Sequence, residues 1–132
     1  MRLAHLLIGL GDVAGARREA ELARLEVAPN DAYTVASSTA ALAAVHAAED
    51  DHDEADRLYR RALELWGRTG YALDLERLRR HYAGFLVDRG RVGEARELLG
   101  QVLAFFGDSP LVARERDLAE SVLRRCAEVS PS

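Results

Sequence analysis

The sequence predicts an all-α fold, a right-handed solenoid of three helical hairpins followed by a capping helix. The pattern at residues 11–16 recurs at 50–55 and again at 90–95. The alanines that close it stand at positions 16, 55 and 95, so the period is 39 and then 40 residues. Self-similarity at this spacing indicates stacked supersecondary units. Apolar residues also recur at intervals of three and four, which is typical of amphipathic helices rather than strands.

Seven helices are expected, at residues 1–10, 12–28, 31–48, from Asp51 or Asp53 to 67, 72–89, 92–106 and 111–128. The repeated turns pair them into hairpins at about 1–28, 31–67 and 72–106, with the helix at about 111–128 as the cap. Together they form a single domain over residues 1–132.

The expected helices begin and end at residues with known preferences for those positions. Gly11 and Gly90 end helices, and Gly67 with Gly70 breaks the helical pattern, because glycine readily adopts the left-handed conformation that follows a helix. Pro29 and Pro110 break the pattern because proline cannot continue a helix. Helix starts are marked by aspartates, namely Asp12 in the first hairpin and Asp51 or Asp53 in the second.

The repeats align beyond the turns themselves. Seven residues before each turn stands an alanine, at positions 4, 43 and 83. Small residues there allow two helices to approach to about 8 to 10 Å. After each closing alanine, apolar residues follow at intervals of four and seven, which lie on one face of a helix. We therefore expect Ala55 and Ala95 to be buried at the hairpin crossings and Ala14 to lie on the outer face.

Residues 53–65 resemble the second helix of a tetratricopeptide repeat, with its alanine, tyrosine and alanine-leucine in order, and residues 90–95 match the family's turn and helix start. The resemblance covers about residues 1–107. The chain departs from the family in its period, which is longer than the usual one of about 34 residues. Thr39 and Arg79 replace the family's tryptophan, and Asp50 replaces a turn glycine. The longer period is similar to that of repeats in large bacterial transcription activators and related signalling ATPases.

The resemblance implies a protein- or peptide-binding module that acts in regulation or complex assembly, without catalysis and without a cofactor. In this family the first helix of each hairpin lines a concave groove. By that register the partner-binding groove would be lined by Ala40, Ala44, Ala47, Arg77, Arg80 and His81. A guanidinium group suits the recognition of carboxylates, so an acidic segment is the expected partner. The alternative is a solvated helix face with pairs such as Glu76–Arg80.

Composition limits the other functions. The net charge is -4, which argues against a broad nucleic-acid-binding face. No apolar stretch approaches the roughly 20 residues needed to cross a bilayer. Cys126 is the single cysteine, so no intrachain disulfide can form, and we expect a cytoplasmic protein with this thiol buried in the last helix. All basic residues are arginine and alanine is abundant, which favours a bacterial, GC-rich origin.

Two patterns resemble ligand sites but are better explained by local structure. His46, His52 and the aspartates at 50, 51 and 53 form the densest set of metal-ligand residue types. Aspartates also favour helix starts and turns, and this set lies at such a junction. The glycines at 9, 11 and 15 resemble a phosphate-binding loop, but such a loop follows a strand, and the chain has no lysine.

Two further possibilities are that the domain belongs to a larger protein and that it pairs with a second copy of itself. The chain would alternatively be a ligand- or peptide-sensing regulatory domain, cut from a larger transcriptional regulator or signalling ATPase. The helix at residues 1–10 is shorter than its counterparts, and its apolar side has little polar covering. We therefore expect either a homodimer through this N-terminal helix or a piece of a longer array.

Overall fold

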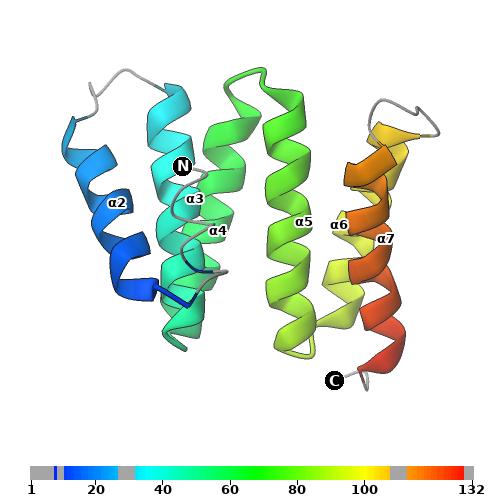
Figure 1. Ribbon diagram of the computed structural model, residues 1–132. Helices are drawn as coiled ribbons and strands as arrows, with labels where there is room; N and C mark the ends of the chain where they lie inside the picture. The colour runs from blue at the N-terminus through cyan, green and yellow to red at the C-terminus, as the bar shows by residue number, and fades with distance from the viewer. Residues whose placement is uncertain (1–7, 9–10, 27–31, 108–112, 130–132) are drawn as a thin grey trace. The chain divides into compact units, whose positions relative to one another are not determined.

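The structure, a computed structural model, describes residues 8, 11–26, 32–107 and 113–129 (Figure 1). This part of the chain is all-helical and holds no strand, which confirms the all-α part of the predicted fold. Its helices are α2 (Val13–Glu26), α3 (Ala32–Ala48), α4 (His52–Gly67), α5 (Ala72–Asp88), α6 (Val92–Phe106) and α7 (Ala113–Glu128). The chain divides into two compact units, Met1–Ala72 and Leu73–Ser132. Apart from Ile8, the expected helix at residues 1–10 lies outside the described residues.

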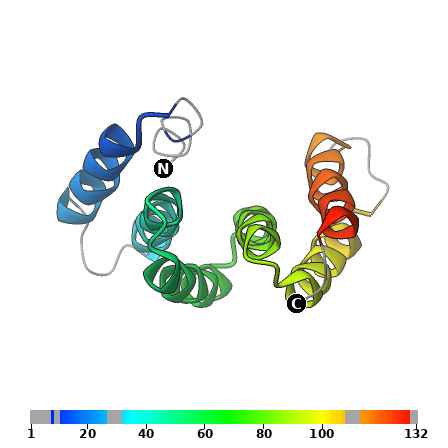
Figure 2. The ribbon, with the colours of Figure 1, turned by 90° about the horizontal axis from the view of Figure 1, so that it is seen from below.

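The core of the first unit is centred on α3. This helix packs against α2 and against α4, and the pair α3–α4 lies side by side in Figure 2. Almost every residue from Ala36 to Val45 is buried. Most of these buried side chains are small (alanine, serine or threonine), so neighbouring helices can approach α3 closely from more than one side. The burial of Ser38 and Thr39 is tolerated because both hydroxyls donate to the Val35 carbonyl one turn earlier.

The alanines that define the repeat are buried as expected. Ala16, Ala55 and Ala95 have no exposed surface, and Ala43 and Ala83, before the turns, have none either. Ala14 is exposed, as its place on the outer face predicts.

The turns that follow α3 and α5 share one hydrogen-bond pattern. The Asp51 amide donates to the His46 carbonyl at 2.9 Å, and the Arg91 amide donates to the Leu86 carbonyl at 2.8 Å. Each bond spans five residues and satisfies a carbonyl that the end of the helix leaves unpaired. The repeat in the sequence is therefore matched by a repeat in turn geometry.

The predicted helix starts are half right. Asp12 caps α2, because its carboxylate accepts a hydrogen bond from the Gly15 amide at 2.8 Å. Asp51 occupies the N-cap position of α4, as one of the two expected candidates, but its side chain makes no capping bond, and Asp53 lies inside the first turn. The carboxylate of Asp51 instead contacts Nδ1 of His46 at 3.0 Å. The expected start of α4 at Asp51 is therefore right in position, but its side chain makes no capping hydrogen bond.

The second unit has its core on α5, α6 and α7. The helices α6 and α7 pack against each other, and their positions as neighbours are visible in Figure 2. Leu86 of α5 and Leu99 of α6 are fully buried. Cys126 of α7 is buried as well, which confirms the expectation for this thiol.

Candidate functional site

The residues predicted to line the groove belong to both units. The small residues lie on α3 of the first unit and the cations on α5 of the second, and they are Ala40, Ala44, Ala47, Arg77, Arg80 and His81. Ala40 is buried, whereas the other two alanines are half-buried. The groove as a whole stays a prediction, and the site is described below from the second unit alone.

Within the second unit, one carboxylate of α7 lies against two of the predicted cations. Nε of Arg77 donates to Oε1 of Glu115 at 2.9 Å, and Nη2 of Arg80 lies 3.7 Å from Oε2 of the same carboxylate. Arg77 and Arg80 are three residues apart on α5, so both side chains project from one face of the helix. His81 follows them and is half-buried.

This cluster is shielded from water and holds more positive than negative charge. The side chains of Arg77, Arg80 and Glu115 are 30%, 15% and 16% exposed. Burial lowers the pKa of Arg80 below its usual range, Glu115 opposes that effect, and the nearby cations Arg77 and Arg114 add to it. Two guanidinium groups therefore share one carboxylate in a partly desolvated place, where charge interactions are stronger than at the surface.

The hydrogen bonding of the cluster is incomplete. Oε2 of Glu115 and Nε of Arg80 are both buried and have no hydrogen-bond partner. The 3.7 Å contact between Arg80 and Glu115 is an ion pair, but it is longer than a hydrogen bond. A buried polar atom without a partner costs free energy, so the internal carboxylate satisfies these arginines only in part.

Glu76 does not pair with Arg80, contrary to the pairing expected for a solvated face. Its Oε1 accepts from Arg79, and its Oε2 is buried without a hydrogen-bond partner. Burial raises the pKa of Glu76, and the attraction of Arg79 opposes that rise. The four basic residues at 77, 79, 80 and 81 therefore do not act together, because Arg79 is held by a different carboxylate from Arg77 and Arg80.

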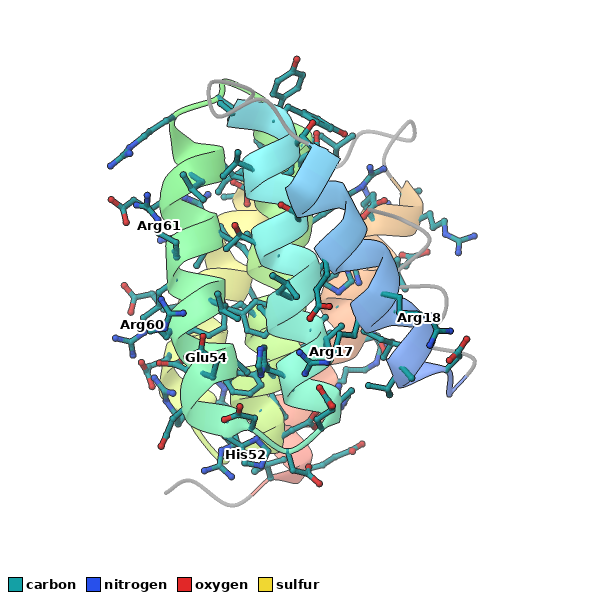
Figure 3. All side chains as sticks on the ribbon, turned by 90° about the vertical axis from the view of Figure 1, so that its left-hand side faces the viewer. Arg17, Arg18, His52, Glu54, Arg60 and Arg61 are labelled. Carbon is teal, nitrogen blue, oxygen red and sulfur yellow. The ribbon has the colours of Figure 1, made fainter. Side chains whose placement is uncertain are left out.

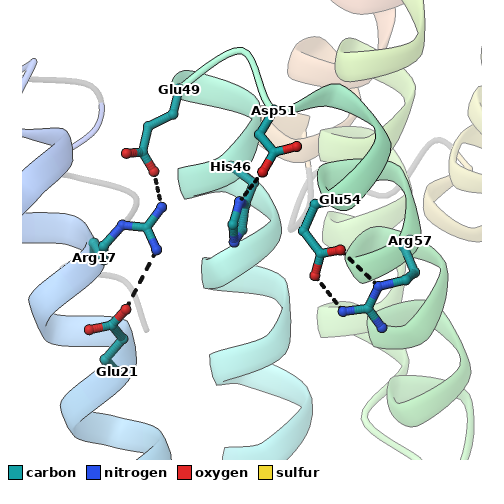
Figure 4. Close-up of polar contacts among 7 residues, drawn as sticks. All are labelled: Arg17, Glu21, His46, Glu49, Asp51, Glu54 and Arg57. Carbon is teal, nitrogen blue, oxygen red and sulfur yellow. Dashed lines mark hydrogen bonds and ion pairs between the residues drawn. The ribbon is translucent and has the colours of Figure 1, made fainter.

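The first unit carries a separate polar network where the α3–α4 turn meets α2 (Figure 4). Arg17 of α2 pairs with Glu49 and, at 3.5 Å, with Glu21 of its own helix. Glu54 and Arg57 pair one turn apart on α4. Of these contacts, the pair Arg17–Glu49 connects α2 to the α3–α4 turn. Nowhere in the described ranges do three or more histidine, cysteine or acidic side chains gather as a metal site would require.

The outer face of α4 carries arginines that are exposed to solvent, unlike Arg77 and Arg80. Arg60 and Arg61 point away from the ribbon in Figure 3. Arg61 is 48% exposed and pairs with Glu64 one turn later on the same helix. Such exposed pairs contribute little to stability. Arg61 therefore serves as a reference for a cation that has no buried environment.

Sequence reasoning missed Glu115, because this residue lies beyond the repeats and has no counterpart in their register. The sequence of α7 nevertheless contains a spacing pattern that indicates a role for this residue. Glu115 precedes Ala119, Val122 and Cys126 by four, seven and eleven residues, so it lies on the same stripe as they do. A single carboxylate on an otherwise apolar stripe indicates a buried charge with a partner on a neighbouring helix.

None of the described helices has the length and apolar character that crossing a membrane would require. A comparison with protein-family models finds no match for this chain, and comparisons with curated proteins and with solved structures find none that is similar.

Proposed function

We propose that this chain is a tetratricopeptide-like, right-handed helical-repeat module that binds an acidic protein or peptide segment in a bacterial cytoplasm, and that it has no catalytic role. The partner's carboxylate is held by Arg77 and Arg80 on α5. The module acts by holding its partner, in regulation or in complex assembly.

One observation carries this proposal: Arg77 and Arg80 already hold a carboxylate. Glu115 lies against both guanidinium groups, so their spacing and direction suit a carboxylate as ligand. Because two guanidinium groups face one carboxylate, a net positive charge remains in this partly desolvated cluster. That excess favours a further acidic group over a neutral one.

The negative net charge of the chain makes the binding of an acidic peptide a specific test for a local cationic site. At -4, the protein as a whole repels an acidic peptide, so any attraction has to come from a local site. The probe is a fluorescein-labelled hexaglutamate peptide, with hexaglutamine as the neutral peptide of matched length. Fluorescence anisotropy at low ionic strength measures the binding of each.

We expect hexaglutamate to bind and hexaglutamine not to bind. Arg77→Ala and Arg80→Ala should each weaken hexaglutamate binding, because each removes a cation from the cluster. Arg61→Ala removes one cation from the exposed face of α4 and should leave binding unchanged. Absence of hexaglutamate binding, or an equal loss in Arg61→Ala, would contradict the proposal.

A further inference from the structure

We propose that Glu115 is an internal competitor for the partner's carboxylate, so that α7 regulates the site by occupying Arg77 and Arg80. This inference rests on the proposed function. An acidic partner binds by replacing Glu115 at the two guanidinium groups. The affinity measured for the partner is then the intrinsic affinity reduced by the fraction of molecules in which Glu115 has left.

The geometry of Glu115 is that of a ligand rather than of a fully paired structural ion. One of its oxygens, Oε1, is hydrogen-bonded to Arg77. The other oxygen has no hydrogen-bond partner although it is buried, and the same is true of Nε of Arg80. A second carboxylate that reached both arginines with better geometry would recover the hydrogen bonds that Glu115 leaves unmade.

Release of Glu115 does not require α7 to leave its place. The helix is held independently at its other end, where Arg125 pairs with Asp88 of α5. It also packs against α6, and Ala119 and Cys126 are buried along its inner stripe. A change in the side-chain conformation of Glu115 is therefore enough to open the site while the core of the unit stays intact.

Glu115→Gln removes the competing charge and keeps the size of the side chain. We expect it to tighten the binding of labelled hexaglutamate by about tenfold, the effect of losing one charge-assisted contact. Glu128→Gln, an exposed position on the same helix, changes the net charge by the same amount and should leave the affinity unchanged. The tightening should disappear when Arg77→Ala and Arg80→Ala are combined with Glu115→Gln.

Glu115→Asp supplies a second variant in case the glutamine variant does not fold. It keeps the negative charge but is one methylene shorter, so it cannot reach both guanidinium groups as Glu115 does. We expect it to bind hexaglutamate more tightly than the wild type does, with an unchanged net charge. Circular dichroism establishes that each variant is folded before its affinity is compared.

The outcomes separate the two proposals. If the wild type binds hexaglutamate through Arg77 and Arg80 but neither Glu115 variant binds more tightly, Glu115 is a positioning residue and the competitor inference is overturned. If only the Glu115 variants bind, Glu115 does occupy the two arginines, but the wild-type chain does not hold an acidic partner, so the proposed function is overturned. If no protein binds, the proposed function is overturned, and this inference with it.

Discussion

Asp50 and Gly90 occupy equivalent positions in the turns after α3 and α5, and both have left-handed backbone, with φ of 61° and 77°. Glycine adopts this conformation without steric cost, whereas a residue with a Cβ atom pays roughly 1–2 kcal/mol there. Aspartate is among the residues that tolerate it best, because its short carboxylate can bond locally. The turn after α3 therefore forms with a residue that fits it less well than glycine does.

Asp50→Gly should stabilise the protein by about 0.5–1 kcal/mol, because it removes the strain in this turn. The contact between Asp50 and His52, at 3.9 Å, is exposed, and its loss should matter little. Urea denaturation measures the free energy of unfolding. Gly90→Ala is the matched control and should destabilise by about 1 kcal/mol. A less stable Asp50→Gly variant would mean that the aspartate side chain stabilises the turn.

Replacing buried and exposed alanines by leucine should affect stability differently. Ala55→Leu and Ala95→Leu should each lower the free energy of unfolding by about 1–3 kcal/mol, since neither alanine has any exposed surface and the added atoms overpack the core. Ala14→Leu, on the exposed face of α2, should change stability by less than about 0.5 kcal/mol. Equal losses at all three positions would show that the register of the repeat is wrong.

Much of the fold is readable from the sequence because glycine and proline mark the helix boundaries. The helix expected at 92–106 has the bounds of α6, and the helix expected at 31–48 differs from α3 by one residue. Both boundaries depend on local backbone chemistry, which a single sequence contains. The partner of Asp51 could not be read in the same way. Asp51 stands at the N-cap of α4, but its carboxylate contacts the His46 imidazole five residues earlier in the same turn rather than a backbone amide of α4.

The candidate site was only partly predictable, because one of its three charged residues lies on a different helix from the other two. The face that Arg77 and Arg80 share follows from helical periodicity. Glu115 reaches them from 38 and 35 positions further along the chain, on a helix that the repeat register does not include. Such a contact depends on how α7 packs in its unit, and no spacing rule within one helix encodes it. The sequence therefore predicted the cations but not the carboxylate that they hold.

Glu76 makes the stability of the protein depend on pH in an identifiable direction. Burial raises its pKa above the ordinary 4.5 of an exposed glutamate, so the folded state holds this proton at pH values where the unfolded state has lost it. The free energy of unfolding should therefore fall as the pH rises through the raised pKa. Glu76→Gln carries no ionisable group at this position, so its stability relative to the wild type should increase as the pH rises above the ordinary pKa of 4.5 and through the raised pKa of Glu76.

Thermal denaturation of both proteins at several pH values measures this difference. Arg79→Gln provides the matched comparison, because Arg79 is the charge that opposes the rise in the pKa of Glu76. Without Arg79, the pH dependence attributed to Glu76 should become larger. A difference between Glu76→Gln and the wild type that stays constant across the pH range would mean that Glu76 is solvated in the folded protein.

Trp66 is buried although its two aromatic neighbours are exposed. Its ring meets Tyr33 edge to face, with centroids 5.0 Å apart, and Tyr71 at 6.2 Å. Tyr33 is 43% exposed and Tyr71 is 51% exposed, so the tyrosines lie between the indole and the solvent. Such edge-to-face pairs contribute about 0.5–1.5 kcal/mol beyond the area that they bury. The cluster therefore connects the first turn of α3 to the end of α4.

Tyr33→Ala should lower the free energy of unfolding by at least about 1 kcal/mol, since it removes the aromatic pairs with Trp66 and Tyr71 and exposes the indole beneath it. Because Trp66 is the only tryptophan, its emission reports this site alone, and we expect its maximum to shift to longer wavelength. Phe105→Ala is the control: Phe105 is 49% exposed and also meets another ring edge to face, but it lies on α6 and its partner is Phe106. It should leave the emission maximum unchanged. If Tyr33→Ala alters neither emission nor stability, the three rings do not form a cluster in solution.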